Sequence, residues 1–203
     1  VDWQAKCYEA GLIATDVPKE YGGHGHHRFQ QIASTEVRRA NVPYFINWIG
    51  LGMAAPTLLA HGTEEQRKSF LPPMFSGEDI WCQGFSEPGA GSDLVSLQTS
   101  AVKDGDNWVV NGSKVWTSLG HFAKWMLLLA RTDKNDKYNG ITYFISPMEA
   151  QGVTVRPIHK MTGESGFNEV FLEEVVVPDH YRIDEVGKGW QVAMSTLTNE
   201  RGA

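Results

Sequence analysis

The chain has 203 residues, 41% of them apolar, and a formal net charge of −6. This length accommodates one or two domains with a substantial core, and the seven tryptophans indicate large buried rings or a flat surface for a planar ligand. The acidic balance, without a basic stripe, argues against nucleic acid as a partner. No apolar run approaches the roughly 20 residues that a membrane span needs.

The cysteines and histidines do not predict a metal centre. Cys7 and Cys82 lie far apart and outside any C-x-x-C spacing, which argues against a disulfide framework and a zinc site. This usage fits a reducing cytoplasm. His24, His26 and His27 share a glycine-rich loop, but cysteine or carboxylate ligands at a fitting spacing are missing, so a solvated turn is the favoured interpretation.

Residues 1–78 are predicted to form a helical domain. Residues 1–12 show no strand alternation and end at Gly11, a plausible helix stop, and residues 29–40 and 49–59 have helical spacing. Thr63 and Gln66 then form a capping box, in which the hydroxyl accepts the third helical N–H and the Gln66 side chain reaches back. We expect that helix to end at Pro72 and Pro73, because a proline cannot donate the helical hydrogen bond.

From residue 79 to residue 185 the apolar period changes to two. Residues 103–107 and the pair Asn111-Gly112 are typical of hairpin turns between apolar runs. Because several short strands follow one another with no helix between them, we predict an antiparallel sheet that closes into a barrel or sandwich. The helical period returns in residues 186–203, so the predicted fold is α+β and multidomain. That pattern still runs at the last residue, and we expect a fragment of a longer protein.

The run from Gly84 to Asp93, GFSEPGAGSD, is the most informative stretch of the chain. Its glycines let the backbone approach a ligand closely, and consecutive loop N–H groups can converge on phosphate or carbonyl oxygens. Ser86 and Ser92 add hydroxyls. The alternative is a plain turn between two strands. The later run KVWTS, residues 114–118, favours the ligand site, because it supplies the second half of a recognisable pattern.

With these motifs the chain resembles the acyl-CoA dehydrogenase family over nearly its whole length. The matching segments are PKEYGG (18–23), HGTEEQ (61–66), SEPGAGSD (86–93), KVWTS (114–118) and GKGW (187–190). The third of these resembles the family's first signature, and Phe85 departs from the family pattern, in which an aliphatic residue is usual. The resemblance implies an N-terminal helical domain, a central β domain and a C-terminal helical bundle, of which only the first helix would be present.

The resemblance also implies an FAD site. The residues that would line it are Gln83, Phe85, Ser86, Gly91, Ser92, Trp116, Thr117 and Ser118. A flavin that accepts a hydride at N5 needs hydrogen-bond donors where negative charge develops, and the hydroxyls of Ser86 and Ser118 can supply them. Trp116 would offer an indole wall against the ring system, the alternative being a core tryptophan on a strand.

Removal of an α-proton from an acyl-CoA needs a carboxylate against that carbon. In two branches of the family this base is a glutamate directly before an arginine on the first bundle helix, which corresponds to Glu200 and Arg201; elsewhere it lies later in the bundle. Glu200 continues an apolar stripe of Trp190, Ala193 and Leu197, and burial there would raise the pKa of its carboxyl. The alternative is an ion pair with Arg201 or a neighbouring subunit, or a frayed helix end.

The resemblance assigns Ser92 and Ser165 to the thioester or the pantetheine arm, and Thr198 and Arg201 to the CoA groove. The leading interpretation is FAD-dependent conversion of an acyl-CoA to a trans-2-enoyl-CoA by a homodimer or homotetramer that passes electrons to an electron-transfer flavoprotein. Two alternatives remain: an acyl-CoA oxidase or flavin monooxygenase on the same fold, and a non-catalytic or truncated partner subunit.

Overall fold

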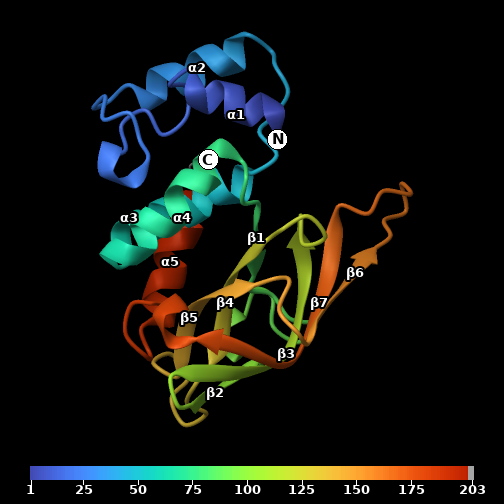
Figure 1. Ribbon diagram of the computed structural model, residues 1–203. Helices are drawn as coiled ribbons and strands as arrows, with labels where there is room; N and C mark the ends of the chain where they lie inside the picture. Colours follow the sequence, from blue (N-terminus) through green and yellow to red (C-terminus); the bar gives the residue numbers. More distant parts are fainter. Residues whose placement is uncertain (201–203) are drawn as a thin grey trace. The chain divides into compact units, whose positions relative to one another are not determined.

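The computed structural model describes residues 1–200, which fall into two compact units, residues 1–80 and residues 81 onward. The first unit is helical, and the second is a β-sheet with one long helix (Figure 1). The predicted α+β class, with helices preceding a β domain, is confirmed. Within residues 1–200 no helix is long and apolar enough to cross a membrane.

The helical unit is built around two buried amides. Its elements are α1 (Asp2–Glu9), a 3₁₀ turn (Lys19–Tyr21), α2 (Gln30–Arg39), a π-helical stretch (Gly50–Ala54), α3 (Ala55–His61) and α4 (Glu64–Ser76). Gln4 Nε2 donates to the carbonyls of Met74 and Phe75 at 3.0 and 3.1 Å. Asn47 Nδ2 donates to the same Met74 carbonyl at 2.9 Å, so both amides meet at the end of α4.

The expected end of α4 at Pro72 and Pro73 is wrong. Both prolines lie inside the helix, which continues to Ser76 and ends at Gly77 in the left-handed conformation (φ 80°). The turn after the prolines is held from outside the helix, because the carbonyls of Met74 and Phe75 accept hydrogen bonds from the amides of other segments. These bonds stabilise the end of α4 beyond the point where the local rule would stop it.

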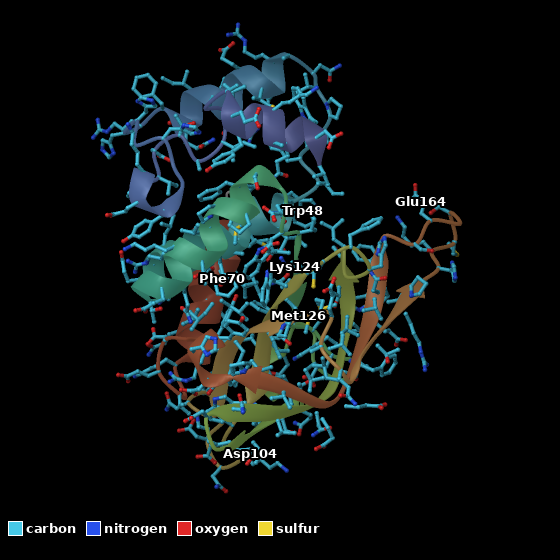
Figure 2. The ribbon with its side chains drawn as sticks, in the orientation of Figure 1. Trp48, Phe70, Asp104, Lys124, Met126 and Glu164 are labelled. Atoms are coloured by element: carbon cyan, nitrogen blue, oxygen red, sulfur yellow. The ribbon has the colours of Figure 1, made fainter. Side chains whose placement is uncertain are left out.

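The second unit is an eight-stranded sheet in the order β6-β7-β3-β2-β4-β5-β8, with β1 paired to β4 (Figure 1). The strands are β1 (Trp81–Gly84), β2 (Ser100–Asp104), β3 (Asn107–Ser118), β4 (Trp125–Arg131), β5 (Ile141–Pro147), β6 (Val153–Ile158), β7 (Phe167–Pro178) and β8 (Arg182–Ile183). Figure 2 shows the fully buried Met126 within this sheet and Glu164 in the loop between β6 and β7.

Two features of the sheet differ from the prediction. The sheet is mixed. Strand β1 pairs with β4 in parallel, whereas the pairs β2–β3, β3–β7 and β4–β5 are antiparallel. Asn111-Gly112 is not a turn but lies inside β3, where the register with β7 shifts between Val110 and Gly112. A Cβ on Gly112 would lie 2.5 Å from Thr99 Oγ1, so the glycine serves a close approach within the sheet.

Helix α5 (Gly189–Glu200) is anchored to β5, and the predicted final helix is confirmed. A Cβ on Gly189 would lie 2.6 Å from the carbonyl carbon of Thr142, so only glycine permits this approach of helix to strand. One to two turns further on, Tyr143 Oη and Thr196 Oγ1 lie 3.1 Å apart, and both side chains are fully buried. These contacts fix which face of α5 remains open.

Replacement of Thr63 by alanine tests the capping box at the start of α4. The backbone N–H of Gln66 donates to Thr63 Oγ1 at 3.2 Å, and the Thr63 N–H donates to Gln66 Oε1 at 3.0 Å. Because Thr63→Ala removes the first contact, we expect the free energy of unfolding to fall by about 1 kcal/mol, measured by urea denaturation with circular dichroism. Thr63→Ser keeps the hydroxyl and is the control; an equal loss in both variants would contradict the role of the cap.

Candidate functional site

An open cavity of about 470 Å³ lies within the β unit, between the loop after β1, the C-terminal part of β3 and helix α5. Its lining is Gln83, Phe85, Ser86, Gly91, Ser92, Leu94, Val115, Trp116, Trp190, Met194, Leu197 and Glu200. The loop contributes Ser86, Gly91 and Ser92 together with the apolar Phe85 and Leu94, whereas α5 contributes mainly apolar residues. The cavity therefore combines a polar rim with an apolar wall, as small-molecule sites do.

A buried ion pair joins the loop to β3. Lys114 Nζ lies 2.8 Å from Glu87 Oε1 and donates to the carbonyl of Phe85 at 3.2 Å. The side chains of Lys114 and Glu87 are 0% and 7% exposed. Next to the pair, the N–H of Val115 donates to the Ser86 carbonyl at 2.9 Å. These contacts connect the two motifs that the sequence singles out.

The Glu87 carboxylate is held by three donors. Its oxygens accept the Lys114 ammonium and the backbone N–H groups of Gln98 and Thr99, the latter two at 2.6 and 2.9 Å. Burial alone would raise the pKa of Glu87, but the charge of Lys114 and these hydrogen bonds outweigh it and the pKa is lowered. Burial lowers the pKa of Lys114 to about 8, although Glu87 opposes this shift.

A β-bulge aims Trp116 into the cavity. Lys114 pairs with Val170 and Thr117 pairs with Asn168, so two residues of β3 stand opposite one residue of β7. Within the bulge Trp116 has a left-handed backbone (φ 61°), and its side chain is 59% exposed. A core position for this tryptophan, the alternative from sequence, is therefore wrong. Its ring meets Phe167 edge-on at 6.0 Å between centroids.

The floor of the cavity is tied to α5 through aromatic contacts. Phe85 is buried and meets the ring of Tyr143 edge-on at 5.7 Å, and Tyr143 in turn contacts Thr196 of α5. On the open side of the same helix, Trp190 packs against Tyr138 with 5.5 Å between ring centroids. The aromatic residue at position 85 thus has a packing role that the usual aliphatic side chain would not fill in this way.

The cavity brings together seven of the residues predicted from sequence: Gln83, Phe85, Ser86, Gly91, Ser92, Trp116 and Glu200. Four others do not line it. Thr117 is fully buried in the sheet, and Ser118 is half-buried beside it. Ser165 Oγ lies 2.9 Å from His159 Nδ1, and Thr198 Oγ1 donates to the carbonyl of Met194 in its own helix. Arg201 lies outside the described residues.

The sequence predicted a buried Glu200, and this prediction is wrong in the structure of residues 1–200. Glu200 lines the cavity, but its side chain is exposed. The apolar residues of α5 lie on two faces. Val192, Ala193 and Thr196 pack inward and are buried, whereas Leu197 lines the cavity. Glu200 follows the cavity-lining side of the helix at its last described turn.

Several cavity residues were missed by the sequence reasoning. Leu94, Val115 and Met194 line the cavity without having been predicted. The spacing of Trp190, Met194 and Leu197 could have predicted that α5 lines the cavity, since helical residues four and seven positions apart share one face. Glu87 and Lys114 belong to the two sequence motifs, but no ion pair between them was predicted. The signal was present, since each is a charged residue among small and apolar ones and the two charges are opposite.

The lining fits a planar aromatic cofactor. Trp116 presents a flat exposed ring, and the Ser86 hydroxyl and Gln83 amide add hydrogen-bonding groups on the same cavity. Cβ atoms on Gly89 and Gly91 would meet nothing within 4 Å, so the loop leaves open space beside it. Within the described residues no three His, Cys, Asp or Glu side chains gather as metal ligands.

Comparison with known proteins identifies the family. Residues 1–78 match the model of the acyl-CoA dehydrogenase N-terminal domain, and residues 82–175 match that of the middle domain. Since the two matches cover most of the chain, the chain belongs to the acyl-CoA dehydrogenase family.

Several relatives of the chain are named acyl-CoA dehydrogenases. The chain is 44% identical to the acyl-CoA dehydrogenase IpdE1 of Mycobacterium tuberculosis over 98% of this chain and 52% of the relative. The Tcur3481-Tcur3483 steroid ACAD aligns with a TM-score of 0.85 and 36% identity, over 98% of this chain and 51% of its own. The ChsE4-ChsE5 complex from Mycobacterium tuberculosis gives 0.83 and 38%, over 97% and 51%. The chain thus spans about half the length of these relatives.

Replacement of Lys114 by methionine tests the buried pair. Lys114→Met leaves the Glu87 carboxylate buried with only backbone donors, so we expect the free energy of unfolding to fall by about 3–5 kcal/mol in urea denaturation. The double variant Glu87→Gln/Lys114→Met removes both charges and should recover a large part of that loss. A single variant as stable as the wild type, or a double variant less stable than Lys114→Met alone, would contradict the account.

Proposed function

We propose that the protein carrying this chain is an FAD-dependent acyl-CoA dehydrogenase that forms trans-2-enoyl-CoA and passes its electrons to an electron-transfer flavoprotein. The observation that carries the proposal is the cavity itself, in which the loop after β1, Trp116 and the carboxylate of Glu200 line one space. Membership of the family supports the same reaction. The cofactor supplies the acceptor for a hydride.

The flavin site in this proposal uses both motifs. The Trp116 ring is the wall for the planar ring system, while the Ser86 hydroxyl and nearby backbone N–H groups serve as donors at its reactive edge. Ser118, which is half-buried and does not line the cavity, is assigned to the same edge on the family resemblance alone. Gln83, Phe85 and Gly91 complete the lining on the loop side. Thr117 has a buried side chain, so it contributes through its backbone. The buried Lys114–Glu87 pair keeps the two motifs in register.

Glu200 is the proposed base. It takes the proton from the carbon next to the thioester carbonyl while the hydride leaves the following carbon for the cofactor, so two C–H bonds break and one C=C bond forms. The carboxylate lines the same cavity as Ser92, which we assign to the thioester. Ser165, Thr198 and Arg201 are assigned to the CoA part of the substrate, on the family resemblance alone.

The wider setting follows the family. We propose a homodimer or homotetramer in the cytoplasm, or in the mitochondrial matrix of a eukaryote. Support for an assembly comes from the ChsE4-ChsE5 relative, which is described as a complex. Completion of the site by a further chain segment or subunit is part of this proposal, because the cavity is open and the chain spans about half the length of its relatives.

Anaerobic mixing of the purified protein and FAD with a panel of acyl-CoA thioesters tests the proposal. The expected result is bleaching of the flavin absorbance by at least one thioester. Glu200→Gln should slow this bleaching by about 10²-fold or more, because the variant has no proton acceptor. Glu185→Gln is the matched control, since Glu185 is also exposed but does not line the cavity, and it should bleach at the wild-type rate.

Each failure of this experiment has a distinct meaning. Bleaching retained at full rate by Glu200→Gln would remove Glu200 from the role of base. If no thioester bleaches the flavin, the proposed dehydrogenase activity is contradicted and a non-catalytic chain is favoured. Rapid reoxidation of the reduced flavin by oxygen, with no need for an electron-transfer flavoprotein, would point to the oxidase on the same fold.

A further inference from the structure

We propose that Asn168 of β7 is a positioning residue that holds the corner of β3, residues 116–119, in the shape that receives the flavin. This inference rests on the proposed function, since the flavin is what the corner would receive. Asn168 does not line the cavity and lies fully buried in the sheet. It acts through the backbone of the corner and not through a contact with the cofactor.

The corner needs to be held because its backbone is strained at both ends. Trp116 has φ 61° and Leu119 has φ 62°, and neither is a glycine. A non-glycine residue in the left-handed region persists only where the surrounding structure determines it. Thr117 and Ser118 lie between these two residues. A contact to that short segment therefore controls where the Trp116 ring and the Ser118 hydroxyl lie.

Asn168 makes that contact. Its Nδ2 donates to the Thr117 carbonyl at 3.0 Å. Because a carbonyl oxygen can only accept, this bond fixes the orientation of the amide. The second Nδ2 hydrogen then faces His121 Nδ1 at 3.1 Å, so that ring nitrogen accepts. One amide group thus holds the end of β3 and the turn that follows it.

Gly120 allows the turn to close on the amide. A Cβ at this position would lie 3.2 Å from Thr117 Cγ2 and 3.3 Å from Asn168 Nδ2, both tighter than ordinary contact. The turn is folded by backbone bonds as well, since Phe122 and Ala123 donate to the carbonyl of Leu119 at 2.8 and 3.0 Å. The side chain of Asn168 is therefore enclosed between β3 and the turn.

Two unpaired oxygens near the corner indicate that Asn168 positions the backbone and contributes little net stability. Asn168 Oδ1 and Thr117 Oγ1 are buried, and neither has a hydrogen-bond partner among the described residues. An unpaired buried oxygen costs stability, which offsets part of what the two Nδ2 contacts contribute. An apolar side chain of similar size would remove the unpaired oxygen. We expect such a substitution to loosen the corner far more than it weakens the sheet.

Two variants and one control test this inference on the purified protein. Asn168→Leu removes the donors and the unpaired oxygen, and Asn168→Ala removes the same groups with a smaller side chain. Ser146→Ala is the control, because Ser146 is also fully buried in the sheet and its hydroxyl has no partner among the described residues. The readouts are the FAD dissociation constant, the flavin reduction potential, and amide hydrogen exchange of residues 115–122 compared with β4 and β5.

For both Asn168 variants we expect FAD to bind roughly tenfold more weakly, which corresponds to the loss of one buried hydrogen bond. The reduction potential should shift, and exchange should accelerate in residues 115–122 while β4 and β5 remain protected as in the wild type. Ser146→Ala should match the wild type in every readout.

The outcomes separate this inference from the proposed function. A wild-type protein that does not bind FAD would overturn the proposed function, while faster exchange confined to residues 115–122 in the variants would still support Asn168 as the residue that holds the corner. Wild-type exchange and affinity in both variants would overturn the inference. Loss of protection throughout the sheet would also overturn it, since Asn168 would then be merely structural. If Asn168→Leu does not fold, Asn168→Ala, which adds neither bulk nor charge, decides.

Discussion

The buried contact between Lys114 and Glu87 is the interaction on which the rest of the site depends. It joins a loop that has little regular structure of its own to the middle of the longest sheet pairing. Two charges taken out of water contribute little net stability, but the loss of one partner is costly. The pair therefore specifies one arrangement of loop and strand. Neither motif by itself would position its cavity-lining residues relative to those of the other motif.

A second constraint acts further along β3. The bulge turns Trp116 outward and returns Thr117 to the sheet, so one strand supplies both a cavity wall and a core position. On the far side of the cavity, the contact of Tyr143 with Thr196 and the close approach of Gly189 to β5 set the face of α5 that remains open. Loop, bulge and helix are thus each fixed by contacts that lie behind the cavity surface.

The sequence predicted the elements and most of the cavity, because the motif residues are contiguous and local patterns set helices and strands. It failed where a tertiary contact overrides a local rule. Pro72 and Pro73 lie inside α4, and amide side chains from other segments hold the turn that follows them. Asn111-Gly112 lies within β3, where Gly112 allows the close approach of Thr99, the residue before β2. The role of Asn168 gave no signal in sequence, since its partner Thr117 is 51 residues away.

The central claim is that the loop after β1, the β3 corner and α5 form one flavin and thioester site. A crystal structure of the protein grown with FAD and a non-reactive acyl-CoA analogue tests it most directly. The account predicts the flavin ring against Trp116 and the Ser86 side of the loop, with the Glu200 carboxylate facing the carbon next to the thioester carbonyl. A flavin bound away from Trp116, or a Glu200 carboxylate directed away from the thioester, would contradict it.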